Sequence, residues 1–148
     1  MAKKILALDL GLNFGYCGGK DLHGCIKVSN NKRMFSFYDS VLDLVVSKRN
    51  GKAFEAIVYE DACFQKGRAI YNFNAQKGIV QLIAESLGIP FIGLPVATIK
   101  SYMLGKSHGL TGAESKEAIR DKINKDGWEV SNLNESDAIA VYYTYLKL

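Results

Sequence analysis

The sequence predicts an α/β domain in which a mixed five-stranded sheet is flanked by helices. Short apolar runs typical of strands open the chain, later strand-like runs alternate with helical periodicities, and the last third reads as helix. With 148 residues, 48% of them hydrophobic, the chain is long enough for one core and too short for two comfortable domains. We therefore expect a single domain over residues 1–148.

The first three strands are expected to form a meander. Residues 4–9 are a continuous apolar run bounded by Gly11, which suits a central strand buried on both faces. Residues 14–19 and 24–28 are short strand-like segments separated by a turn region at 21–24, so they should extend the sheet antiparallel.

Helices and strands then alternate. Residues 35–46 repeat apolar side chains near helical spacing, and residues 54–60 return to strand character before the acidic pair Glu60-Asp61. A polar loop at 65–68 leads to a helix over 74–87, whose predicted apolar stripe is Ile79, Leu82, Ile83 and Leu87. Gly88 should end this helix.

The last third contains one more strand and three helices. Residues 89–94 form a strand with Pro90 at its start and Pro95 after it, which suits an edge position. Residues 96–104 predict a short helix. Thr111 and Glu114 have the spacing of a capping box for a helix to about residue 125, and residues 134–146 predict an amphipathic helix capped by Asn132 or Asn134.

Composition restricts the class of protein. Nineteen basic against fifteen acidic residues give a net charge of +4, which permits a nucleic-acid partner without requiring one. Cys17, Cys25 and Cys63 lack the spacing of a zinc site, which favours a reduced, cytoplasmic compartment. No apolar stretch approaches membrane-spanning length, so we expect a soluble protein with no membrane partner.

Three acids lie at the ends of predicted elements: Asp9 after the first strand, Glu60 after the fourth, and Asp137 in the first turn of the last helix. Alone, each has a simpler explanation as a turn residue, a solvated charge or a favourable charge at a helix start. Together, clustered carboxylates would repel one another, and hard divalent cations such as Mg²⁺ or Mn²⁺ would relieve that repulsion. Two such ions can support phosphodiester hydrolysis.

Six short segments, in this order, resemble the RuvC group of Holliday junction resolvases within the ribonuclease H-like superfamily. They are residues 5–11 (ILALDLG), 14–16 (FGY), 56–60 (AIVYE), 76–79 (QKGI), 111–116 (TGAESK) and 134–140 (NESDAIA). The resemblance spans nearly the whole chain. It implies a ribonuclease H-like sheet and a Mg²⁺-dependent or Mn²⁺-dependent nuclease with a role in DNA recombination and repair.

The resemblance also implies the site residues. Asp9, Glu60 and Asp137 carry over as catalytic metal ligands, and Lys116 as a catalytic residue that stabilises phosphate charge. The position three before the last acid is usually an acid or a histidine, whereas this chain has Asn134, whose amide oxygen can still bind a hard cation. Glu135 or Asp61 could replace it as the fourth ligand.

The expected DNA contacts follow from the same resemblance. They are Phe64, Lys66, Arg68, Lys100, Lys106 and Lys116. An aromatic residue after the second acid would contact bases at the junction centre, although a loop aromatic packed on the core explains Phe64 equally well. Basic residues at the rim would hold phosphates, although surface lysines often serve only solubility.

The leading hypothesis is an endonuclease that binds four-way DNA junctions as a homodimer and makes paired symmetric nicks. One alternative is a related nuclease acting on other branched DNA or on structured RNA, and another is a non-catalytic nucleic-acid binding module, which the Asn134 departure favours. An actin-like ATPase shares the strand-hairpin opening but needs a second such half, for which the chain is too short. His23 and His108 receive no catalytic role.

Overall fold

The computed structural model describes residues 4–29, 31–47, 54–62, 67–106, 109–130 and 132–148. Its sheet has five strands in the order β3-β2-β1-β4-β5. The strands are β1 (Ile5–Asp9), β2 (Asn13–Gly19), β3 (Leu22–Lys27), β4 (Ala56–Asp61) and β5 (Phe91–Pro95). β1 pairs antiparallel with β2 and parallel with β4, β2 and β3 pair antiparallel, and β4 and β5 pair parallel. The predicted mixed sheet, the central first strand and the edge position of the last strand are confirmed.

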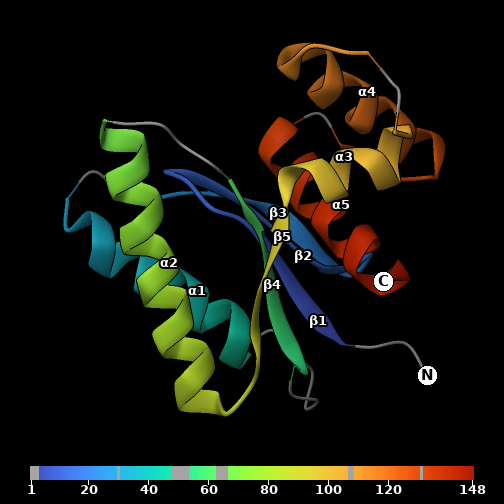
Figure 1. The fold of residues 1–148 in the computed structure, drawn as a ribbon. Helices are drawn as coiled ribbons and strands as arrows, with labels where there is room; N and C mark the ends of the chain where they lie inside the picture. The colour runs from blue at the N-terminus through green and yellow to red at the C-terminus, as the bar shows by residue number, and fades with distance from the viewer. Residues whose placement is uncertain (1–3, 30, 48–53, 63–66, 107–108, 131) are drawn as a thin grey trace.

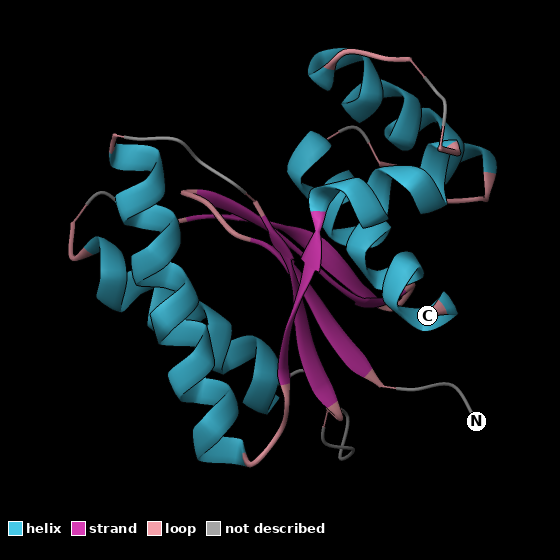
Figure 2. Cartoon of the chain, in the orientation of Figure 1, coloured by secondary structure: helices cyan, strands magenta, loops and turns pink. Residues whose placement is uncertain are grey.

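Helices cover both faces of this sheet. One layer contains α1 (Arg33–Ser47) and α2 (Arg68–Leu87), and the other contains α3 (Val96–Leu104), α4 (Gly112–Lys125) and α5 (Leu133–Lys147). Figure 1 shows the two layers on opposite sides of the strands, and Figure 2 shows the same arrangement by secondary structure. None of the helices in the described ranges is long and apolar enough to cross a membrane.

Alternate residues of β1 and β4 face opposite cores. Those that pack with α1 and α2 are Leu6, Leu8, Ile57 and Tyr59, and those that pack with α3, α4 and α5 are Ile5, Ala7, Ala56 and Val58. Side chains of a strand alternate between its faces. Asp9 therefore faces the same side as Ile5 and Ala7, and Glu60 the same side as Ala56 and Val58. The two acids are therefore directed to the face that α5 covers.

Helix ends follow the predicted capping chemistry. The Thr111 hydroxyl accepts from the Glu114 amide at 3.3 Å, and the Glu114 carboxylate accepts from the Thr111 amide at 3.0 Å. Gly88 ends α2 with φ 68°, a left-handed conformation that glycine adopts without strain. Of the two candidate caps for α5, Asn132 is the one used, since its side chain accepts from the amides of Asn134 and Glu135.

The extent and buried face of α2 differ from the prediction. The helix begins at Arg68 rather than at residue 74, because Phe73 is buried and extends the contact with the core by a turn. The predicted apolar stripe was also wrong at Leu82 and Leu87, which are 62% and 39% exposed. The buried side chains of α2 are Phe73, Gln76, Val80, Ile83 and Ala84. The buried face therefore includes a glutamine that the predicted apolar stripe did not contain.

The β2–β3 turn also lies earlier than expected. β2 ends at Gly19 and β3 begins at Leu22, so Lys20 and Asp21 form the turn instead of residues 21–24. Two-residue connections are common in antiparallel hairpins. As a result, His23 lies within β3, paired with Cys17, rather than in the turn.

Candidate metal centre

Three carboxylates from distant parts of the chain meet at one edge of the sheet. Asp9 and Glu60 lie at the carboxyl ends of the neighbouring parallel strands β1 and β4, and Asp137 lies near the start of α5. One ligand oxygen from each lies within 4.8 Å of the others. This spacing and these hard oxygen ligands fit a divalent cation such as Mg²⁺ or Mn²⁺.

Burial and mutual repulsion make these carboxylates hard to ionise. The pKa of Asp9 is raised well above its usual value, first by burial and then by the charges of Asp137 and Glu60. Burial also raises the pKa of Glu60, with a further contribution from Asp137, and burial raises the pKa of Asp137. A bound cation would supply the positive charge that stabilises the ionised forms.

Two lysines approach the carboxylates from the helical side. Lys116 of α4 places its Nζ 3.2 Å from Asp137 Oδ2, and its side chain remains 53% exposed. The Asp137 carboxylate raises the pKa of Lys116, which therefore stays charged. Lys100 of α3 also lies close enough for its charge to lower the pKa of Glu60. Each of these lysines could hold an anionic phosphate oxygen beside the acids.

A fully buried glutamine fixes the turn that follows Asp9. The Gly11 N–H donates to Gln76 Oε1 at 2.7 Å, and Gln76 Nε2 donates to the Gly11 carbonyl at 2.9 Å. Both hydrogen bonds join α2 to the backbone two residues beyond Asp9. Gln76 belongs to the Gln76-Lys77-Gly78-Ile79 motif, but this structural role was not predicted; its spacing from Phe73 and Val80 on the buried face was the available signal.

The start of α5 lies directly on β2. A Cβ at Gly15 would collide with the Asn134 carbonyl oxygen and would lie 2.9 Å from the Glu135 amide, so only glycine permits this approach. The approach brings Asp137, one helical turn beyond Asn134, to the sheet edge. The glycine of the Phe14-Gly15-Tyr16 motif therefore has a packing role at the site.

Asn134 lies beside Cys25 of β3. Burial raises the pKa of the Cys25 thiol, the charges of Asp9 and Glu135 raise it further, and a hydrogen bond with the Asn134 side chain lowers it. Asn134 is thus at the same end of the sheet as the three carboxylates. Its role as a fourth ligand stays a prediction.

The two suggested substitutes for the fourth ligand have other partners. Glu135 Oε2 lies 2.7 Å from His23 Nδ1, and Asp61 Oδ1 lies 3.6 Å from Lys77 Nζ. Within the described residues, the acidic group contains neither of these carboxylates. Glu135 instead joins the first turn of α5 to β3.

The expected DNA contacts fall into three groups. Lys116 lies beside the carboxylates, and the charge of Lys100 lowers the pKa of Glu60. Arg68 is the first residue of α2, and Lys106 is an exposed residue beyond the end of α3. Phe64 and Lys66 lie outside the described residues, so their DNA roles stay predictions.

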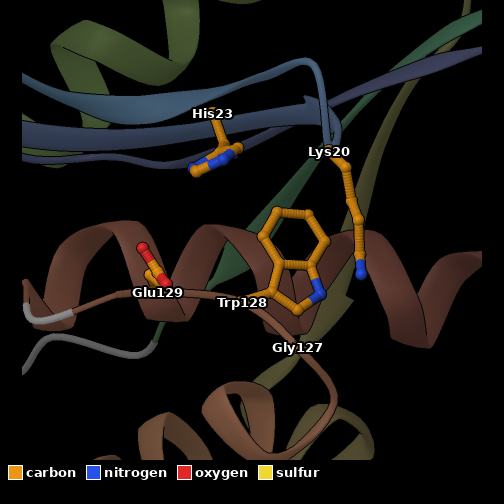
Figure 3. A pocket seen from close by; sticks show the side chains of 5 residues that line it. All are labelled: Lys20, His23, Gly127, Trp128 and Glu129. Carbon is orange, nitrogen blue, oxygen red and sulfur yellow. The ribbon is translucent and has the colours of Figure 1, made fainter.

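A separate cavity of about 330 Å³ lies where the β2–β3 turn meets the segment before α5. Its lining residues are Lys20, His23, Gly127, Trp128 and Glu129 (Figure 3). Trp128 is buried, its Nε1 donates to Tyr143 Oη at 2.7 Å, and Lys20 Nζ lies 5.5 Å from its ring centroid. The indole N–H of Trp128 already has a hydrogen-bond partner. Packing around the Trp128 ring accounts for the residues that line this cavity.

Comparison with solved structures identifies the architecture. T. thermophilus RuvC in complex with Holliday junction substrate superposes with a TM-score of 0.71 at 18% identity, over 95% of this chain and 90% of that chain. The chain has a RuvC-like fold. A second Thermus thermophilus RuvC structure gives a TM-score of 0.67 at 18% identity, over 95% of this chain and 91% of that one.

A eukaryotic protein has the same RuvC-like fold. The yeast mitochondrial Holliday junction resolvase gives a TM-score of 0.61 at 15% identity, over 99% of this chain and 78% of that chain. No family model and no curated protein sequence matches the chain. The predicted fold class is confirmed by these neighbours, whereas the identities are too low to transfer their activity directly.

Proposed function

We propose that this chain is a divalent-metal-dependent endodeoxyribonuclease that resolves four-way DNA junctions by paired nicks. The observation that carries the proposal is the group of three carboxylates, two half-buried and one buried, within 4.8 Å of one another, with Lys116 beside them. The RuvC-like fold supports the substrate class, since one similar structure is a RuvC in complex with a Holliday junction substrate.

Asp9, Glu60 and Asp137 would hold Mg²⁺ or Mn²⁺, and the amide oxygen of Asn134 could add a neutral ligand. Such ions, when bound, activate a water and stabilise the leaving oxygen of a phosphodiester. The carboxylate of Glu60 would orient the attacking water, and the exposed ammonium of Lys116 would pair with a phosphate oxygen as negative charge develops.

Two cuts in one junction require two active sites, so the proposal includes a homodimer. Leu82 of α2, a large apolar side chain that is 62% exposed, is the proposed contact in the dimer. Ile79, one turn away, packs partly against the core and is less available. Analytical ultracentrifugation that finds only monomer at micromolar concentration would contradict the dimer.

The protein would act in a reducing, cytoplasmic compartment. Cys17 and Cys25 are both free thiols, as expected there.

The direct test is cleavage of a fluorescently labelled synthetic four-way junction with Mg²⁺ or Mn²⁺. The wild-type protein should make symmetric nicks in two strands of like polarity, and Asp9→Asn should make none while still binding the junction. Flap DNA, linear duplex and an RNA hairpin of matched length serve as substrate controls. Equal cleavage of all DNA forms, or preference for the RNA hairpin, would replace junction resolution with the broader nuclease.

A non-catalytic binding module is the second candidate, and Asn134 favours it by removing one charge from the expected ligand set. Tight junction binding with no cleavage in either metal would support this candidate. Restoring an acid with Asn134→Asp separates the two cases further. If the wild type binds without cutting and Asn134→Asp cuts, the missing acid at position 134 alone accounts for the lack of cleavage.

A further inference from the structure

A second cavity, of about 500 Å³, lies where α1 and α2 begin. Its lining residues are Arg33, Met34, Arg68, Tyr71 and Asn72. Tyr71 is 69% exposed, so its ring is accessible to a ligand. The cavity therefore combines two guanidinium groups with an accessible aromatic ring.

The positive charge of this cavity comes from Arg33 and Arg68. Neither Arg33 nor Arg68 forms an ion pair with an acid among the described residues. The first turns of α1 and α2 contain no acidic residue, whereas those of α4 and α5 contain Glu114 and Glu135. A guanidinium presents planar, paired N–H donors that match the oxygens of a phosphate. The chemistry of the cavity therefore suits a phosphate linked to a ring that can stack.

The cavity lies at the same end of the sheet as the carboxylates. Asn72 precedes Gln76 by one turn of α2, about 5.4 Å of helix rise, and Gln76 hydrogen-bonds to Gly11, two residues beyond Asp9. Figure 1 shows the start of α2 near the upper ends of the strands, in the layer opposite α3 and α4. The two arginines and the lysines of α3 and α4 thus lie on opposite sides of the carboxylate edge.

We propose that this cavity is a second DNA subsite, in which Arg33 and Arg68 bind a backbone phosphodiester and Tyr71 stacks on an adjacent unpaired base. The inference rests on the proposed function and extends it, because it defines how a strand continues after it leaves the carboxylates. A strand held by Lys100 and Lys116 on one side and by this subsite on the other is fixed at both ends across the metal centre. Stacking is interrupted at a branch point, so a base is more easily unpaired there than inside a linear duplex, and the subsite favours branched DNA.

The test uses the full chain with Asp9→Asn, so that DNA is not cut. Fluorescence anisotropy measures the Kd for a labelled four-way junction and for a linear duplex over a range of KCl concentrations. Arg33→Gln/Arg68→Gln should weaken junction binding about 10- to 100-fold and should reduce the salt dependence by about one to two units of log Kd per log [KCl]. Lys125→Ala/Lys147→Ala removes the same charge from exposed positions elsewhere and should leave both quantities nearly unchanged.

The aromatic contribution is tested separately. Tyr71→Leu should weaken junction binding about 10-fold with little change in duplex binding, and Tyr71→Phe should bind like the parent, because stacking needs the ring and not the hydroxyl. All these side chains are exposed or half-buried, and thermal unfolding followed by circular dichroism verifies that each variant folds.

The outcomes separate the two proposals. If the parent binds the junction and the wild type cuts it, but the arginine variant binds like the parent, the subsite is wrong and the nuclease proposal stands. If the parent binds no DNA, both are wrong. The last measurement tests inorganic phosphate. A contrary result is that phosphate raises the Tm of the parent but not that of Arg33→Gln/Arg68→Gln, while both proteins bind DNA with the same Kd. That result would assign the cavity to a free anion and overturn the DNA subsite.

Discussion

Replacing Asp9 by asparagine should make the metal-free protein more stable while abolishing its activity. The substitution preserves the size of the side chain and removes one of three carboxylates that lie within 4.8 Å of one another. Most substitutions at buried positions destabilise a protein, so a gain in stability is a distinctive outcome.

The magnitude follows from the spacing of the charges. Two unit charges 4.8 Å apart repel by about 3.5 kcal/mol at an effective dielectric constant of about 20, and by about 0.9 kcal/mol in bulk water. Asp9 has two such partners, Glu60 and Asp137, and Lys116 offsets part of the repulsion. We therefore expect Asp9→Asn to raise the free energy of unfolding by about 1–3 kcal/mol, or the Tm by roughly 3–10 °C.

The assay is thermal unfolding in EDTA at about pH 8, well above the ordinary carboxyl pKa, because ionisation of these carboxylates creates the repulsion and their pKa values are raised. Asp121→Asn is the matched control, because Asp121 is an exposed acid of α4 and its substitution should change stability by less than about 0.5 kcal/mol. Adding Mg²⁺ or Mn²⁺ should raise the Tm of the wild type and not that of Asp9→Asn. A metal-free Asp9→Asn protein that is less stable than the wild type would refute the argument that repulsion among these carboxylates is strong.

Three further predictions concern the support of the site. Gln76→Leu leaves the N–H and the carbonyl of Gly11 without their partner. It should lower the free energy of unfolding by about 2–4 kcal/mol and weaken Mn²⁺ binding, measured by calorimetry. Unchanged metal affinity would contradict a positioning role for Gln76. Lys116→Gln should slow junction cleavage about 100-fold, whereas Lys125→Ala on the same helix should not; equal rates would exclude Lys116 from the reaction. Burial raises the pKa of all three carboxylates, so their protonated forms stabilise the metal-free fold at acid pH and this contribution is lost as pH rises through the raised pKa values. The rise in Tm caused by Mg²⁺ should therefore be larger at about pH 8 than at about pH 5.5, and a rise that does not depend on pH would contradict this linkage.

The strands were predictable because their signals are local. The apolar run of residues 4–9 and the return to strand character before Glu60 depend only on neighbouring residues, and both strands were found there. The face of α2 was harder, because a periodicity search counts apolar residues and does not expect a buried glutamine. Gln76 is tolerated in the core only because Gly11, distant in sequence, satisfies both ends of its amide.

The candidate site likewise combines features that the sequence predicted with features that depend on contacts between distant residues. Positions at the ends of elements and the resemblance together singled out Asp9, Glu60 and Asp137, and the structure brings them to one edge. The sequence left open whether Glu135 or Asp61 joins them, because that choice depends on long-range partners. His23 contacts one of these acids and Lys77 the other, and neither contact has a sequence signature.

The order in which the carboxylates occur along the chain has a consequence for biosynthesis. Asp9 and Glu60 belong to strands made early, whereas Asp137 lies on α5, which is translated after all five strands. A nascent chain that has not yet released α5 from the ribosome holds two of the three acids and lacks the helix that covers them. The complete group of three carboxylates should thus form only when α5 docks over Gly15, after the rest of the sheet has been synthesised.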